Sequence, residues 1–251
     1  MIEVNNVSKS FKDQKVLKNI SFTLDEGKIN LIIGRSGSGK TVLLKSLVGL
    51  HEVDEGSIIF DDRNFTKMDE IERKDVRKEL GMVFQGSALF DSMTLEQNVM
   101  FPLKMFTNMT MEEMLERTNF CLNRVEVENK NKLFPSEISG GMQKRVAIAR
   151  AIALNPKYLF CDEPNSGLDP RTALVIDELI TEITKEFKIT TVINTHDMNS
   201  VLEMGEKIIF IFNGEKWWEG TKEQIWETDD KEVNDFIFAS QFAKKIKNNS
   251  R

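Results

Sequence analysis

The sequence has few of the residues and segments that mark secreted or membrane-spanning proteins. It contains only two cysteines, Cys121 and Cys161, at no spacing typical of a metal site, which favours reduced, buried thiols in a cytosolic protein. No apolar run approaches the roughly 20 residues of a membrane span. The first residues lack signal-peptide character. We therefore expect no direct membrane insertion, so any membrane role has to come through a partner.

An excess of positive charge is also missing. The 251 residues carry a net charge of −6, with 40% hydrophobic and 29% charged residues, a composition typical of a globular protein with a full core. This balance argues against nucleic acid as a partner. ATP remains possible, because it needs only local cations and backbone N–H groups. The sequence shows neither an internal repeat nor a low-complexity linker.

Apolar periodicity changes along the chain. Strand patterns occupy residues 2–11, 15–24, 28–34, 56–62 and 80–84, and later 157–163 and 189–196. Helix patterns occupy residues 40–50, 70–78 and 171–187, and a hairpin is expected around Asn213-Gly214. Between residues 86 and 155 the strand signals vanish: capping boxes at Thr94–Gln97 and Thr110–Glu113 predict two helices, and a third is expected over 141–154.

These patterns predict an α/β chain with a helical insert. We expect a single domain over 1–251, divided functionally into three parts. Residues 1–85 and 156–225 form a core with an antiparallel β subdomain at its N-terminal end, residues 86–155 form a helical subdomain, and residues 226–251 form a C-terminal helix and basic tail.

A glycine-rich loop between a predicted strand and helix carries the strongest motif. "GRSGSGKT" matches G-x-x-x-x-G-K-[ST] and indicates a P-loop NTPase with a RecA-like, mostly parallel sheet. Its glycines let backbone N–H groups point at phosphates. Lys40 supplies a charge to the β- and γ-phosphates, and Thr41 a hydroxyl to Mg²⁺. The predicted ATP-binding residues are Gly34, Arg35, Ser36, Gly37, Ser38, Gly39, Lys40 and Thr41.

Further catalytic candidates follow predicted strands. Asp162 ends "KYLFCD", where it could hold Mg²⁺, and Glu163 is placed to activate water. His196 ends another strand and is expected to meet the γ-phosphate and the water. Gln85 ends "LGMVF" at the start of the helical insert, where it could sense Mg²⁺ and transmit a movement. Each of these residues alone could have a purely structural role. Together with the glycine-rich loop, they favour a role in ATP hydrolysis.

A second glycine turn stands in "ISGGMQKR". It places Ser139, Gly140 and Gly141 at the start of a predicted helix, the usual setting of an anion site. It has no lysine of the "GKT" kind. One chain thus carries two phosphate-type turns of unequal composition.

The motifs in this order resemble those of the nucleotide-binding subunit of an ABC transporter. The resemblance implies a head-to-tail homodimer, in which Ser139, Gly140 and Gly141 of one copy contact the ATP held by the other copy. It also implies that Asp169 lies in a loop at the dimer seam. Phe11, with Val16 nearby, matches the aromatic residue that stacks on adenine; the alternative is that Phe11 is a core residue.

The stretch "FQGSALFDSMTLEQNVMFPL" and the variant residue Met142 resemble the ATPases of Mla/Mce-type lipid transporters. This implies a permease that docks near Gln85 and residues 86–106, and a membrane-anchored, lipid-binding Mce-type protein. The apolar residues of the docking window are Leu89, Phe90, Met93, Leu95 and Phe101, about half of which are expected in the core. We expect a cytoplasmic protein, peripheral on the inner face of the bacterial inner membrane, that uses ATP and Mg²⁺ to move phospholipid.

Three alternatives stay open. The chain could serve a small-solute importer for amino acids or metals, or act as a cell-division ABC ATPase outside transport. It could also be an inactive subunit, although Lys40, Asp162, Glu163 and His196 are intact. Met142 replaces a glutamine whose polar contact to nucleotide is then in doubt.

Overall fold

Two compact units make up the chain. The computed structural model describes residues 1–239. The first unit contains Met1–Asp25, Ile29–Lys67 and the chain from Asn194 onward; the second contains Glu26–Lys28 and Met68–Ile193. The functional division expected from the sequence stays a prediction, and most of its basic tail, residues 240–251, lies outside the described residues.

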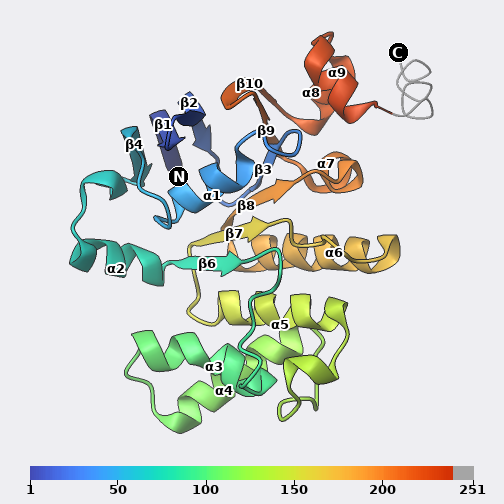
Figure 1. The fold of residues 1–251 in the computed structure, drawn as a ribbon. Helices are drawn as coiled ribbons and strands as arrows, with labels where there is room; N and C mark the ends of the chain where they lie inside the picture. Colours follow the sequence, from blue (N-terminus) through green and yellow to red (C-terminus); the bar gives the residue numbers. More distant parts are fainter. Residues whose placement is uncertain (240–251) are drawn as a thin grey trace. The chain divides into compact units, whose positions relative to one another are not determined.

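An antiparallel sheet forms the start of the first unit (Figure 1, blue). Its strands lie in the order β2-β1-β4-β5, with β1 at Ile2–Phe11, β2 at Gln14–Leu24, β4 at Glu55–Phe60 and β5 at Arg63–Asn64. The predicted alternation is confirmed, because Ile20, Phe22 and Leu24 on one face of β2 are all buried. The sheet is therefore apolar on one face, as an antiparallel sheet with one solvated face should be.

Parallel pairing occurs in the same unit. β3, Ile29–Ile33, is buried along its whole length and pairs in parallel with β9, Lys207–Phe212. The predicted hairpin joins β9 to β10, Glu215–Gly220, in antiparallel register. Its turn residues Asn213 and Gly214 have φ of 50° and 81°, the left-handed values of a type I′ turn.

Helices complete this unit. α1, Lys40–Leu47, follows β3 and ends earlier than predicted, because Gly49 takes a left-handed φ of 73° and stops the helix. Three short helices lie near the C-terminus: α7 at Met198–Met204, α8 at Lys222–Glu227 and α9 at Lys231–Ile237. Of these, only α9 falls within a helix expected from the sequence.

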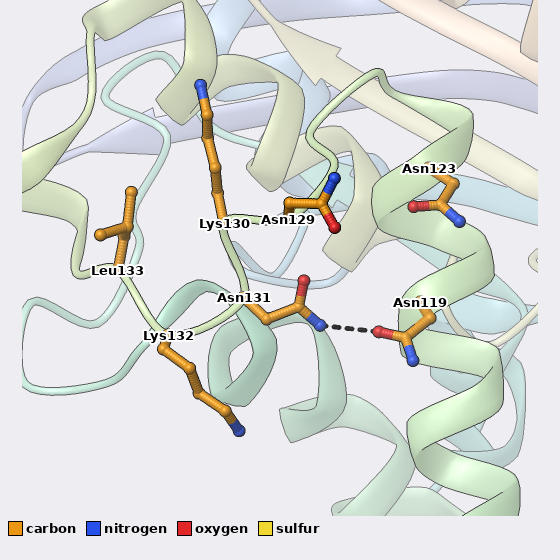
Figure 2. A pocket seen from close by; sticks show the side chains of 7 residues that line it. All are labelled: Asn119, Asn123, Asn129, Lys130, Asn131, Lys132 and Leu133. Atoms are coloured by element: carbon orange, nitrogen blue, oxygen red, sulfur yellow. Dashed lines mark hydrogen bonds between the residues drawn. The ribbon is translucent and has the colours of Figure 1, made fainter.

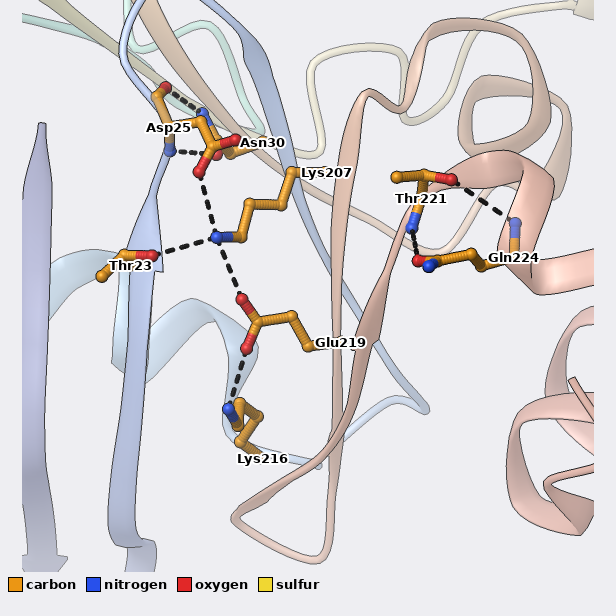
Figure 3. A network of polar contacts seen from close by, with 8 residues as sticks. All are labelled: Thr23, Asp25, Asn30, Lys207, Lys216, Glu219, Thr221 and Gln224. Atoms are coloured by element: carbon orange, nitrogen blue, oxygen red, sulfur yellow. Dashed lines mark hydrogen bonds and ion pairs between the residues drawn. The ribbon is translucent and has the colours of Figure 1, made fainter.

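A half-buried lysine of β9 bonds to residues of two other segments of the first unit (Figure 3). Lys207 Nζ donates to Thr23 Oγ1 and Asp25 Oδ1, and forms an ion pair with Glu219, each at 3.0 Å. Burial alone would lower the pKa of Lys207, but its bonds to Glu219 and Asp25 outweigh burial and raise the pKa. The cluster fixes the ends of β2 and β10 against β9.

In the second unit the strands run β8-β7-β6. β6, Leu80–Val83, pairs in parallel with β7, Tyr158–Asp162; β8 spans Thr190–Thr195 and contributes its first four residues to this unit. Helix α2 covers Glu70–Lys78, as predicted, and α6 covers Pro170–Phe187. The continuous burial of β7 and β8 is typical of strands covered on both faces.

The helical insert lies in this unit too. Both predicted capping boxes are present, at Thr94 before α3, Leu95–Phe106, and at Thr110 before α4, Met111–Arg124. The third helix, α5, covers Gly140–Ile152 and contacts both (Figure 1, green). Cys121 is buried here, and burial raises its pKa to about 11, so it stays a thiol at neutral pH.

The fold class predicted from the sequence is confirmed. Parallel strand pairs flanked by helices, a separate antiparallel sheet and a helical insert are all present. Within residues 1–239, no helix combines the length and the apolar character needed to cross a membrane.

Candidate active site

The phosphate loop, residues 34–41, joins β3 to α1 in the first unit. Gly34, Gly37 and Gly39 have positive φ, which only glycine adopts without steric cost. A Cβ on Gly34 would stand 2.3 Å from the backbone oxygen of Ile211. The glycines thus allow both the turn and a close backbone approach. Gly39 caps α1 without a side-chain bond, which leaves the N–H groups of the first turn suited to an anion.

Lys40 and Thr41 take the predicted positions. Lys40 is only 6% exposed, and its ammonium donates to the carbonyl oxygens of Gly34 and Arg35 at 2.8 and 3.1 Å. The charge therefore lies inside the loop. Thr41 is exposed, and its hydroxyl accepts a bond from Asn194 Nδ2 at 3.2 Å. Because a hydroxyl oxygen has two lone pairs, this arrangement suits a group that also binds a cation.

Two other predicted residues of this unit can be placed. His196 is exposed and follows β8 directly, one residue before Asp197, the N-cap of α7. Val16 packs against the phosphate loop: a Cβ on Gly39 would lie 3.1 Å from the Val16 carbonyl oxygen. Phe11 is 41% exposed, so the alternative of a core residue is wrong. Its ring contacts His51 edge-on at 5.2 Å, which leaves His51 half-buried.

Arg35, within the phosphate loop, reaches toward the C-terminal part of the unit. Its guanidinium lies over the ring of Phe212 at 5.7 Å and 3.7 Å from Glu232 in α9. Trp217 packs edge-on against Phe212, and its indole N–H donates to Asp230, the N-cap of α9, at 3.0 Å. The hairpin tryptophan therefore contacts the N-terminal end of this helix.

In the second unit, the structure brings Gln85 and Glu163 together. Gln85 Nε2 donates to Glu163 Oε2 at 2.8 Å and to Ser166 Oγ at 3.3 Å. Asp162 is 4% exposed at the end of β7. Glu163 has a left-handed φ of 46°, which is costly for a residue with a Cβ and is found most often at functional positions. A candidate base and a candidate sensor are thus in direct contact.

The second glycine turn forms the start of α5. Ser139 is its N-cap and accepts from Met142 N at 3.3 Å. Gly141 lies against α6, because a Cβ there would stand 2.7 Å from Thr172 Cγ2. Thr172 in turn donates to Asp169, the N-cap of α6, at 2.5 Å. Thr172 therefore contacts both the turn and Asp169, although the turn and Asp169 lie about 30 residues apart in the sequence.

A polar cavity of about 530 Å³ lies between α4 and the loop that follows it (Figure 2). Its lining consists of Asn119, Asn123, Asn129, Lys130, Asn131, Lys132 and Leu133. Asn131 donates to Asn119 at 2.6 Å, and Lys130 Nζ lies 3.9 Å from the sulfur of Met142. The sulfur of Met142 is therefore in contact with a cation from this loop.

Sequence reasoning missed Lys144. It is 5% exposed in α5, and its ammonium donates to the carbonyl oxygen of Gln85. Burial lowers its pKa, while the charges of Cys161, Glu163 and Asp162 act in the opposite direction. It stands in the run "MQKR", which resembles any exposed basic helix face, so the sequence offered no signal of burial.

The residues fit ATP and Mg²⁺. The buried Ser38 hydroxyl has no hydrogen-bond partner among residues 1–239, and the phosphate loop offers it, together with Lys40, to an anion. Within the same residues, no group of three or more His, Cys, Asp or Glu could hold a metal alone. The Thr41 hydroxyl and the Asp162 carboxylate are oxygen donors of the kind that Mg²⁺ takes, together with substrate phosphates.

Comparison with known proteins decides the family. The chain matches the ABC transporter family over residues 17–166. The chain belongs to the ABC transporter ATPase family. It is 44% identical over 211 residues to a methionine import ATP-binding protein, MetN, of Clostridium tetani, covering 84% of this chain but only 66% of that protein. It is 35% identical over 237 residues to the intermembrane phospholipid transport ATP-binding protein MlaF of Haemophilus influenzae, covering 94% and 90%.

A solved ABC cassette has the same fold. The dimeric structure of MJ0796, a bacterial ABC transporter cassette, superposes with a TM-score of 0.82 at 35% identity and covers 88% of this chain. A post-hydrolysis dimer of that cassette holds ADP and Pi. This ABC ATPase is accordingly an ATP hydrolase that uses ATP and Mg²⁺. The roles of individual residues stay predictions, because Lys40 and Thr41 belong to one unit and Gln85 and Asp162 to the other.

Proposed function

We propose that this chain is the ATP-hydrolysing subunit of a bacterial inner-membrane transporter that moves phospholipid between the inner and outer membranes. In this proposal, Lys40 and the phosphate loop bind the phosphates, and Thr41, Asp162 and Gln85 hold Mg²⁺. Glu163 acts as general base and His196 contacts the γ-phosphate. Phe11 and Val16 bind the adenine. Catalysis is positioning and charge neutralisation.

The transport part of the proposal is carried by an apolar groove of about 280 Å³ in the second unit. It lies beside the loop that follows Gln85. Its lining includes four phenylalanines: Phe84, Phe90, Phe101 and Phe106. Phe90 is 41% and Phe106 36% exposed, which is unusual unless such a surface meets a partner. We assign the groove to a permease segment. Leu95, expected here, is fully buried in α3.

The lipid part is supported by the likeness to MlaF over 94% of this chain. A second function, energising a small-solute importer, is supported by the 44% identity to MetN. Purification of the tagged chain from membranes separates them. A permease together with a membrane-anchored, lipid-binding protein is expected. Recovery of a solute-binding protein with the permease would instead support the importer.

The base is tested by Glu163→Gln. We expect turnover to fall about 100-fold or more, because positioned bases contribute on this scale, while ATP still binds and the dimer persists. Hydrolysis by Glu163→Gln at the wild-type rate would contradict the assignment. Binding of a labelled nucleotide, measured in parallel, shows that the variant is folded.

The proposed homodimer is tested by mixing variants. Lys40→Met and Ser139→Arg should each be inactive alone. A mixture should regain part of the activity, because each mixed dimer keeps one composite site with both residues intact. Mixing two separately prepared samples of Lys40→Met is the control. If the mixed variants recover nothing beyond that control, the two copies do not share sites in trans.

A further inference from the structure

The loop that carries Gln85 is held in an unfavourable conformation. Ser87 and Ala88 both have left-handed φ, 62° and 48°. Two successive residues with a Cβ in this region are rare, because the side chain then crowds the following carbonyl. The turn has few bonds of its own: Ser87 N donates to Phe84 O and Ala88 N to Gly86 O. Something outside the loop has to stabilise it.

That stabilisation comes from two cationic side chains of α5. The Lys144 ammonium donates to Gln85 O, and Arg150 donates to Ser87 O at 2.9 Å and Ala88 O at 2.8 Å. Three carbonyls within four residues are thus bound by one helix. Hydrogen bonds from charged donors are stronger than neutral ones, and more so when buried. Lys144 is the more buried of the two side chains.

The same loop presents the Gln85 side chain to Glu163. The backbone oxygen of Gln85 is bound by Lys144, while its amide donates to Glu163 and Ser166. Residue 85 therefore links α5, whose N-cap is Ser139, to the end of β7. A shift of α5 along this connection would change the donor that Glu163 receives.

We propose that Lys144 is a positioning residue: it clamps the strained loop 85–88 to α5, the helix that starts at the second glycine turn, so that Gln85 is held against Glu163 and moves with that helix. The inference rests on the proposed roles of Gln85 and Glu163 in hydrolysis. It adds to them a cation that acts through the backbone of residue 85. Arg150 is the second clamp, on the far side of the strained pair.

The experiment compares wild type, Lys144→Met and Lys144→Met/Ala88→Gly, with Lys185→Met, an exposed lysine of α6, as the matched control. Methionine keeps most of the length and removes the ammonium. In the absence of nucleotide, hydrogen exchange of the amides of residues 86–90 should become about ten-fold faster in Lys144→Met, while α6 exchanges as in wild type. Lys185→Met should leave residues 86–90 unchanged.

Turnover gives the second readout. We expect kcat for ATP to fall about ten-fold in Lys144→Met, with KM within about two-fold, since the phosphate loop is untouched. In the double variant Lys144→Met/Ala88→Gly, both the exchange rate and kcat should return part of the way to wild type, because glycine adopts the left-handed conformation without the steric cost. If residues 86–90 of Lys144→Met exchange at the wild-type rate, Lys144 does not clamp the loop. If they exchange faster but kcat stays at the wild-type value, Lys144 does not position Gln85 for hydrolysis.

The exchange measurement needs no hydrolysis. If Glu163→Gln hydrolyses ATP normally, the proposed base is wrong, yet residues 86–90 still report whether Lys144 holds the loop. The two failures are therefore separate.

Discussion

The phosphate loop and the signature turn, residues 138–142, both place glycines at the start of a helix, but for different physical reasons. The glycines at 34, 37 and 39 have positive φ, whereas Gly140 and Gly141 lie within α5 with ordinary helical geometry. In the loop, glycine supplies conformational freedom. In the signature turn, Gly141 supplies close approach, since a Cβ would meet Thr172.

Charge separates the two turns further. The phosphate loop encloses the ammonium of Lys40. The signature turn has only the Ser139 hydroxyl and backbone N–H groups, and Lys130 Nζ lies 3.9 Å from the Met142 sulfur. The loop can therefore bind phosphate by itself, while the turn is suited to add to a phosphate already bound elsewhere.

The largest expected effect comes from Gly34→Ala. Its Cβ would stand 2.3 Å from a backbone oxygen, and backbone moves only at high cost, so we expect about 3 kcal/mol of destabilisation. The matched control is Gly37→Ala, where nothing lies within 4 Å and only the φ of 78° opposes a side chain. It should cost about 1 kcal/mol. Urea unfolding measures both; equal losses would refute the close approach.

Gly141→Ala should have an intermediate effect of about 1–2 kcal/mol, because the Thr172 methyl it meets can shift. Gly140→Ala, whose nearest atom is 3.9 Å away, should be neutral or slightly stabilising, since alanine favours helix. Thr172→Ser removes the methyl group but keeps the hydroxyl that bonds Asp169, and should restore Gly141→Ala. If the serine variant restores nothing, crowding is not the cause.

The smallest effect concerns Asp169. Its bonds to Thr172, from the side chain first and then the backbone, lower its pKa. A carboxyl with a lowered folded pKa stabilises the fold fully above its ordinary pKa, about 3.9, and loses this as pH falls through the lower folded value. The difference in free energy of unfolding between wild type and Asp169→Asn should therefore stay constant from about pH 8 to 5 and shrink at lower pH. Urea midpoints of both proteins, measured from neutral pH down into acid, check this sign. A stability difference that grows in acid would contradict the prediction.

Local signals predicted most of the fold. Helix α2 has the expected bounds, Glu70–Lys78, and the boxes at Thr94 and Thr110 mark true helix starts, because capping depends on residues close in sequence. Strand β5 and helix α7 were missed, since two to seven residues carry little periodicity. The start of α8 was readable: Thr221 and Gln224 form a capping box.

The candidate site was predicted less evenly. Glycine spacing identified the phosphate loop, because its function depends on consecutive residues. The contact of Gln85 with Glu163 and the burial of Lys144 depend on packing between segments some 60 to 80 residues apart, which no single-sequence pattern records. The left-handed pair Ser87–Ala88 was unpredictable for the same reason, as neither residue is typical of that conformation.

The bond between Arg35 and Glu232 has a practical consequence for protein engineering. Helix α9 begins about 20 residues before the end of the 251-residue chain, yet its first turn contacts the phosphate loop. A reporter fused in place of α9, or a truncation before Asp230, would remove the partner of Arg35 and of Trp217.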